Sequence, residues 1–193
     1  KITRKNQIKV CGMPRMDKLH YWRKKVYKKS NLAFSQNPTI LVLPVLENNF
    51  LPIYSGMDDG KRWKILSRGI IESSLKFASL RKDVTIFVRP RSSQIDEINN
   101  KINNLTNEIP SNFVISSEGN VEENIFDAWC VVGHNTTVLL EALAAGKIVI
   151  EPGFGEARFQ EYKEFIVDLN GSSLIAKSEK QLINLMDKYT RTR

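Results

Sequence analysis

The sequence lacks the features that would indicate a membrane protein, a disulfide-rich protein, a dinucleotide-binding protein or a metalloprotein. It has no run of about 18 apolar residues and no hydrophobic leader, so neither a membrane span nor a signal segment is predicted. Two cysteines, Cys11 and Cys130, are too few for a disulfide framework, and a reducing compartment is expected. The glycine-rich dinucleotide fingerprint is absent, so no NAD or FAD cofactor is predicted. His20 and His134 are isolated in the sequence, and no metal site is predicted.

What is present indicates a packed α/β protein. The chain has 193 residues, of which 41% are hydrophobic and 26% charged, enough for one core and too apolar for wholesale disorder. Because it begins at Lys1 and not at a methionine, we expect a fragment of a longer protein.

The positive charge is concentrated at one end. Residues 1–30 contain 11 Lys or Arg and a single Asp, although the whole chain has a net charge of +8, so the remainder is slightly acidic. A basic segment next to Tyr21 and Trp22 suits a solvated linker or helix face, or alternatively an anionic membrane surface or acceptor. No nucleic-acid-binding motif accompanies the charge, so nucleic acid is not a predicted partner.

Strand and helix patterns alternate along the chain. Besides a short strand at 7–10, we expect strands at 39–45, 84–88 and 113–116, and a helix over 61–80. Further helices are expected after Ser92 and Ser93, over 120–127 capped by Asn120, and after a capping box of Ser178 and Gln181. This alternation predicts a Rossmann-like, doubly wound parallel sheet with helices on both faces. It occupies residues 38–193, and residues 1–37 form a basic N-terminal arm.

The stretch from Trp129 to Pro152 is the most informative part of the sequence. It reads as a buried strand, a small polar turn, an apolar helix, Gly146 and a second buried strand. Ligands of such sheets bind at the carboxyl ends of the strands. The turn Gly133–Thr137 lies at such an end, where Asn135, Thr136 and Thr137 either hold a phosphate or simply cap the helix.

Glu141 adds a second polar position to this helix. It follows Thr137 by four residues, on the same helix face and one turn deeper. Its neighbours Leu140 and Ala142 are apolar, so a carboxylate here needs a partner. The two hydroxyls of a ribose would supply one if the phosphates lie at the turn; the alternative is an exposed helix glutamate.

The segment from Thr137 to Ile150 resembles the donor-site signature of GT-B-fold glycosyltransferases, in which a polar turn precedes a helix containing Glu-Ala. Gly12–Asp17 is similar to the interdomain crossover of bacterial surface-polysaccharide transferases of this fold. The resemblance implies that the chain is the C-terminal, donor-binding half, that Glu141 binds the ribose and that the Asn135–Thr137 turn binds the phosphate of a nucleotide-sugar. The retaining enzymes of this fold carry a second glutamate where Gly133 stands, so that sugar contact is not carried over.

Other residues at the predicted ligand edge have weaker signals. Arg89 and Arg91 end a strand and either neutralise the donor phosphate or form a surface turn. His134 either donates to a phosphate or sugar oxygen or is structural. Gly153 and Glu156 follow the next strand and either contact the sugar or base or belong to a plain turn.

The resemblance implies a metal-independent glycosyltransferase domain that needs no cofactor and lacks its N-terminal half. It would take a nucleotide-sugar donor and a surface-polysaccharide, lipopolysaccharide or other glycolipid acceptor, in the cytoplasm or at the inner face of the membrane. The alternatives are a GT-B-fold nucleotide-sugar epimerase and a non-catalytic nucleotide-binding or assembly module. The base, the sugar and the stereochemical outcome are left open by the sequence.

Overall fold

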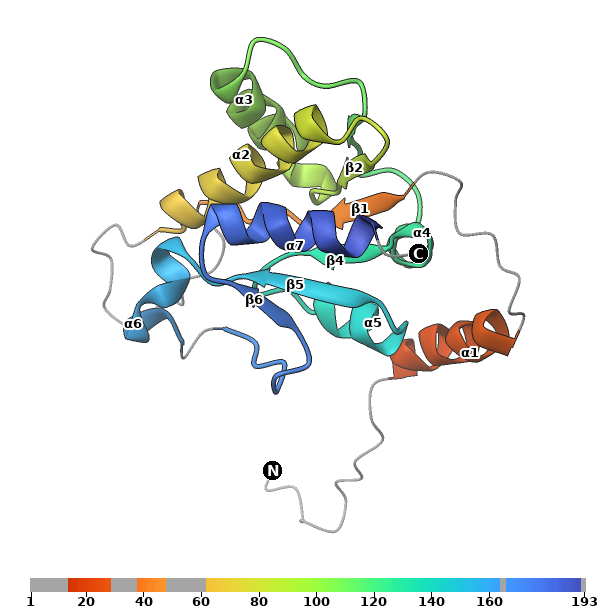
Figure 1. Ribbon diagram of the computed structural model, residues 1–193. Helices are drawn as coiled ribbons and strands as arrows, with labels where there is room; N and C mark the ends of the chain where they lie inside the picture. The colour runs from red at the N-terminus through yellow and green to blue at the C-terminus, as the bar shows by residue number, and fades with distance from the viewer. Residues whose placement is uncertain (1–13, 29–37, 48–61, 164–165, 192–193) are drawn as a thin grey trace.

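The computed structural model describes residues 14–28, 38–47, 62–163 and 166–191. Its centre is a six-stranded sheet in which every pair of neighbouring strands is parallel, with the order β3-β2-β1-β4-β5-β6 (Figure 1). The strands are β1 Thr39–Val42, β2 Thr85–Val88, β3 Phe113–Ile115, β4 Cys130–Val132, β5 Ile148–Pro152 and β6 Leu174–Ala176. The predicted doubly wound α/β fold is therefore confirmed.

Helices cover both faces of the sheet. The α-helices are α1 Pro14–Lys28, α2 Lys64–Leu80, α3 Ile95–Leu105, α4 Val121–Asp127, α5 Val138–Ala144, α6 Gln160–Lys163 and α7 Glu179–Arg191. Two short 3-10 helices are η3 Ser92–Gln94 and η4 Gly155–Arg158. One core layer joins α2, α3 and α7 to the sheet, and the other joins α1, α4 and α5 to the opposite face. The alternation of side chains along each strand supplies both layers, as in β1, where Ile40 and Val42 face one layer and Leu41 the other.

Most predicted elements are confirmed, with shifts at their ends. The strand predicted over 39–45 ends at Val42, because Pro44 has no N–H with which to continue the ladder. Asn120 caps α4 as predicted, since its Oδ1 accepts a hydrogen bond from the amide of Glu122 at 3.0 Å. The amide of Gln181 donates to Oγ of Ser178 at 3.2 Å at the start of α7, also as predicted.

The predicted serine caps before α3 are wrong. Ser92 and Ser93 lie within η3, and the residue that precedes α3 is Gln94, which makes no side-chain capping bond. The strand predicted at 7–10 lies outside the described residues, as do Gly12 and Met13 of the predicted crossover motif.

The basic arm contributes a helix to the second layer. Leu19 of α1 is 1% exposed and packs in the same cluster as Leu139 of α5. On the outer side, Lys18 pairs with Glu122 of α4 at 3.4 Å. The described part of the arm therefore packs on the body, next to α4 and α5.

Gly69 in α2 permits a close approach between helices and the loop after β5. A Cβ at this position would lie 2.7 Å from Cε2 of Phe154 and 2.9 Å from Oε1 of Glu179. The carboxylate of Glu179 is exposed and can turn away, whereas the ring of Phe154 is 5% exposed and packed in the core.

We expect Gly69→Ala to destabilise the protein. Alanine gains about 1 kcal/mol of helix propensity over glycine, but overpacking against Phe154 costs about 1–3 kcal/mol. The net loss should appear as a lower denaturation midpoint in urea. Lys76→Ala, at an exposed position of the same helix, serves as the control and should leave the midpoint nearly unchanged. A Gly69→Ala variant more stable than wild type would contradict the packing argument.

Candidate functional site

A crevice opens where β1 and β4 lie side by side. The chain leaves β1 toward α2 in one layer and leaves β4 toward α5 in the other, so the two connections diverge at the carboxyl ends of these strands. The cavity volume is about 370 Å³, which suits a small-molecule ligand. Its lining comes from the connections after β1, β2, β3 and β4: Leu43, Pro44, Arg89, Pro90, Arg91, Ser92, Gln94, Ser117, Val121, His134, Asn135, Thr136 and Val138.

The turn after β4 is held tightly at both ends. A Cβ on Gly133 would lie 3.1 Å from Cβ of Leu43 and 3.1 Å from Cδ2 of Leu139, so a larger side chain meets packed neighbours there. Asn135 has a φ of 49°, in the left-handed region, and its Oδ1 accepts a hydrogen bond from the amide of Val167 at 3.1 Å. This bond fixes the turn against the segment that follows α6.

The threonines of the turn keep polar groups near the crevice. Oγ1 of Thr136 lies 3.4 Å from the amide of Val138, which donates to it. Thr137 precedes α5, is exposed, and makes no side-chain capping hydrogen bond. The hydroxyl of Thr137 is therefore not committed to capping the helix.

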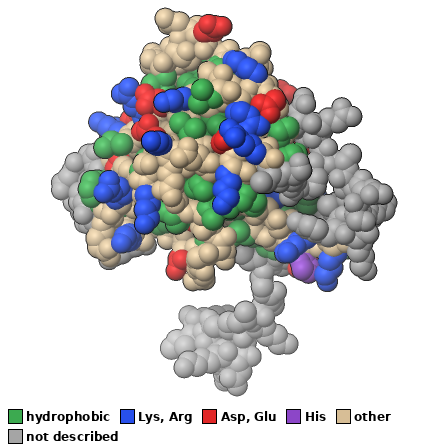
Figure 2. All heavy atoms as spheres, in the orientation of Figure 1, with side chains coloured by type: hydrophobic (Ala, Val, Ile, Leu, Met, Phe, Trp, Pro, Cys, Tyr) green, Lys and Arg blue, Asp and Glu red, His purple; other side chains and the backbone are tan. Residues whose placement is uncertain are grey.

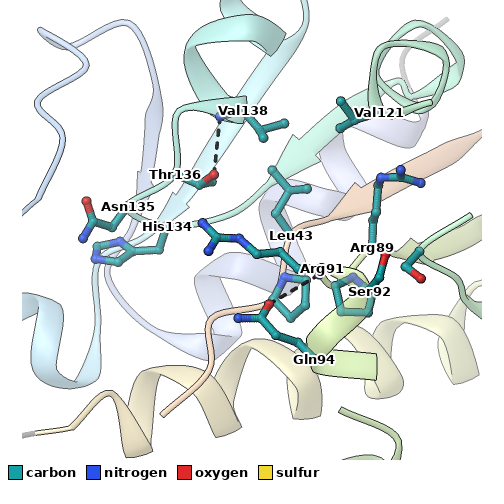
Figure 3. Close-up of a pocket in the computed structure, with 13 residues that line it drawn as sticks. Leu43, Arg89, Arg91, Ser92, Gln94, Val121, His134, Asn135, Thr136 and Val138 are labelled. Carbon is teal, nitrogen blue, oxygen red and sulfur yellow. Dashed lines mark hydrogen bonds between the residues drawn. The ribbon is translucent and has the colours of Figure 1, made fainter. Parts of the chain in front are cut away.

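Two arginines at the end of β2 point in different directions (Figure 3). The guanidinium of Arg89 donates to the carbonyl oxygens of Glu118 at 2.6 Å and Gly119 at 2.8 Å, and to Oδ1 of Asn124 at 2.7 Å. Arg91 instead extends across the crevice toward His134 and Thr136 and is exposed. Arg89 thus fastens the connection between β3 and α4, while Arg91 presents its positive charge to the crevice.

His134 is buried at the edge of the crevice. Its side chain is 6% exposed and its ring meets Trp63 edge-on, with centroids 5.1 Å apart and an interplanar angle of 63°. Burial lowers the pKa of His134 from 6.5 to about 4, and the backbone of Pro152 acts in the opposite direction. Neither ring nitrogen makes a hydrogen bond of regular geometry. At neutral pH the ring is therefore uncharged.

Five of the predicted site residues do not line the crevice: Gly133, Thr137, Glu141, Gly153 and Glu156. Glu141 is buried on α5, with 7% of its surface exposed. The amide of Gly153 donates to the carbonyl of Ala176 at 2.8 Å, and a Cβ there would lie 2.6 Å from Cγ2 of Ile175. Glu156 accepts hydrogen bonds from the amides of Ile65 and Leu66, each at 2.8 Å, and so caps the N-terminus of α2. Their ligand contacts stay predictions.

The connection after β2 contributes more residues to the crevice than the sequence predicted. Arg91, Ser92 and Gln94 all line the crevice, as does Ser117 after β3. Because these residues follow neighbouring parallel strands, their position in the sequence could have predicted that they line the crevice.

Among the described residues no three His, Cys, Asp or Glu side chains are grouped as a metal site would require. None of the helices in the described ranges has the length and apolarity needed to cross a bilayer.

Comparisons with known proteins identify the fold. No protein family matches the sequence, and no curated protein matches it. Among solved structures, the wall teichoic acid polymerase TagF matches 98% of this chain with 46% of its own, at 14% identity and a TM-score of 0.57. UDP-GlcNAc 2-epimerase from Methanocaldococcus jannaschii, solved with UDP-GlcNAc and UDP, matches 99% of this chain with 50% of its own, at 16% identity and a TM-score of 0.56.

A third similar structure is the ADP-heptose lipopolysaccharide heptosyltransferase II of E. coli, which matches 96% of this chain with 53% of its own, at 11% identity and a TM-score of 0.54. The chain spans about half the length of each of these proteins. It therefore has the Rossmann-like fold of one half of the GT-B glycosyltransferases and epimerases, as the sequence resemblance predicted.

The buried histidine predicts a loss of stability in acid. The unfolded chain takes up a proton near pH 6.5, whereas folded His134 does so only near pH 4, so stability falls as the pH drops through this window. A shift of this size is worth roughly 3 kcal/mol. NMR titration should give a midpoint near pH 4, with His20→Gln used for assignment. His134→Phe should weaken the acid sensitivity; a midpoint near 6.5 would contradict the burial.

Arg89 and Arg91 should differ in their effect on stability. Arg89→Ala removes three hydrogen bonds from a charged donor, and we expect a loss of about 2 kcal/mol in urea denaturation. Arg89→Lys should recover only part of this loss, because a lysine ammonium keeps the charge but cannot reach all three acceptors as the planar guanidinium does. Arg91→Ala, at an exposed position, is the matched control, with a change of about 0.5 kcal/mol or less. Equal losses for both alanine variants would refute the different roles.

Proposed function

We propose that this chain is the nucleotide-sugar donor-binding domain of a glycosyltransferase. The observation that carries the proposal is the crevice beside β4, with Arg91 on one wall and Asn135 and Thr136 of the turn on the other. A diphosphate is the ligand that fits a guanidinium facing a turn of hydroxyls and backbone amides. The fold supports the same reading, because the similar structures include two enzymes of glycan or teichoic acid assembly.

In this proposal the phosphates lie between Arg91 and Thr136–Thr137, and Glu141 receives the ribose hydroxyls one helical turn deeper. His134, as a neutral ring, contributes a hydrogen bond and no charge. Arg89, Gly133, Gly153 and Glu156, which were predicted to bind the donor, support the site from outside through the contacts described above. Of the two arginines to which the sequence assigned a possible phosphate contact, Arg91 takes this role in the proposal and Arg89 does not.

The chemical step is transfer of the sugar from its nucleotide to an acceptor hydroxyl. The bond between the sugar and the phosphate breaks, and the leaving nucleotide gains negative charge. Arg91 and the turn amides are placed to stabilise that charge, which is often the largest single contribution to catalysis. The acceptor pocket and the general base would come from a second domain, since the chain spans half of each similar protein.

The acceptor is proposed to be a surface-polysaccharide or lipid-linked glycan, with the enzyme peripheral to the membrane. The basic residues 1–30 can contribute to such an attachment through their charge. A nucleotide-sugar epimerase is the second candidate, because an epimerase resembles this chain as closely as the transferases do. Product analysis separates them: an epimerase converts the donor sugar without any acceptor, whereas a transferase releases nucleotide only when an acceptor is present.

Nucleotide binding is the direct test of the site. In calorimetry with UDP, CDP, CMP and GDP, at least one nucleotide should bind. Arg91→Ala, Thr137→Ala and Glu141→Gln should each weaken binding by about tenfold, the loss expected for a hydrogen bond to a charged group. Lys76→Ala, on the far part of α2, should bind as wild type. The proposal is wrong if none of the nucleotides binds, or if all three site variants bind normally.

A further inference from the structure

A second hollow lies between helices α2 and α3, apart from the crevice. Its volume is about 570 Å³, which is within the range of sites for small ligands. The two helices lie side by side (Figure 1), and the hollow shares no lining residue with the crevice. We call it the α2–α3 groove. It is lined by Glu47 after β1, by Lys64 and Arg68 of α2, and by five residues of α3 between positions 97 and 105.

The floor of the groove is a fixed polar network. Nζ of Lys101 donates to Oε1 of Glu47 at 2.9 Å and to Oγ of Ser67 at 2.8 Å. Ser67 is fully buried, and the side chain of Lys101 is 14% exposed. The hydrogen bond from Lys101 holds the pKa of Glu47 below its usual value, so this carboxylate is ionised at neutral pH. The third N–H of the ammonium and the second carboxylate oxygen make no hydrogen bond to another described residue, and both are available to a ligand.

Asparagines form one wall of the groove. Four of the six residues 99–104 are asparagine, although asparagine is a poor residue for the interior of a helix. Asn100 and Asn104 are four residues apart on one face of α3, and both line the groove. Both are exposed, and neither side-chain amide makes a hydrogen bond to another described residue. Each amide therefore offers a donor and an acceptor side by side.

The charges around the groove largely cancel. Arg68 forms an ion pair with Glu72 at 2.7 Å, and the ammonium of Lys101 is already paired with a carboxylate of the floor. Lys64 and Glu97, both exposed, add one charge of each sign. The upper part of Figure 2, where α2 and α3 lie, shows Lys and Arg side chains beside those of Asp and Glu. The groove therefore selects neither an anion nor a cation.

A neutral ligand with closely spaced hydroxyls suits this lining. Each hydroxyl of a sugar both donates and accepts, so neighbouring hydroxyls on one ring match an amide, which does the same. Leu105 adds an apolar contact for the C–H face of the ring. No aromatic side chain of the described residues lines the groove, which argues against a nucleobase, because bases bind by stacking. We propose that the α2–α3 groove binds a neutral glycan.

The groove begins close to the crevice. Gln94 lines the crevice, and Glu97, about one helical turn later, lines the groove. Likewise Lys64 of the groove follows Trp63, whose ring contacts His134 at the crevice. A glycan in the groove is thus placed near the site of sugar transfer, as an acceptor or product chain would be. This placement rests on the proposed function, whereas glycan binding itself does not.

NMR on the isotope-labelled chain tests the groove with maltotetraose, cellotetraose, chitotetraose and mannotetraose, and with a sialic acid tetramer as the anionic probe. At least one neutral oligosaccharide should shift the side-chain amide signals of Asn100 and Asn104 in a saturable way. The double variant Asn100→Ala/Asn104→Ala should bind it about tenfold more weakly, because the hydrogen bonds of both amides are lost. Alanine is the better helix former, so this variant should unfold at or above the wild-type midpoint.

The matched control is Asn99→Ala/Asn103→Ala, which makes the same substitutions at the same spacing on a face of α3 that does not line the groove. It should bind the oligosaccharide as wild type. Three results would overturn the proposal: no shift of Asn100 and Asn104 with any neutral probe, equal losses in the two double variants, or tighter binding of the sialic acid tetramer at this place. Both variants should bind nucleotides as wild type, so a failure of the donor site and a failure of the groove are separate outcomes.

Discussion

The parallel pairing of β1 with β4 is the constraint on which the rest of the structure depends. The paired residues Ile40 with Cys130, Leu41 with Val131 and Val42 with Val132 are all fully buried, so a slip of one residue would move every side chain to the wrong layer. This register brings the two diverging connections to the same height, and the crevice lies between them. The connections after β2 and β3 then supply its second wall, including Arg91 and Ser117.

Cations that look alike in the sequence serve different purposes around this crevice. Arg89 donates to two backbone carbonyls just before α4, and Lys147 donates to those of Phe126 and Ala128 at the C-terminal end of α4, at 2.6 and 2.8 Å. Helix α4 is thus fastened at both ends by partly buried positive charge, which removes the cost of leaving carbonyl groups unpaired. The guanidinium of Arg91 makes no comparable hydrogen bond to a carbonyl group of the described residues, and its charge remains directed at the crevice. Rigid walls and one available guanidinium are the combination that a phosphate site needs.

Local patterns predicted the framework, and contacts distant in sequence decided the site. Apolar runs, Asn120 and Gly146, which has a φ of 76°, were sufficient to predict most strands, a cap and a helix end. The roles of Arg89 and Arg91 could not be separated, because both follow the same strand and only the position of α4 distinguishes them. Glu156 reaches Ile65, a residue 91 positions away, which no local pattern reports. The burial of His134 likewise depends on Trp63 from another connection.

The cap formed by Glu156 also explains where an anion can bind. In dinucleotide-binding sheets the pyrophosphate lies at the N-terminus of the helix that follows the first strand. Here that helix is α2. The N-terminal amides of Ile65 and Leu66, which have no partner within the helix, donate to the carboxylate of Glu156. A phosphate at that place would meet both occupied donors and a negative charge. The absence of a glycine fingerprint after β1 and the carboxylate of Glu156 at the N-terminus of α2 are therefore consistent with each other, and both agree with the proposal that the anion binds at the turn after β4.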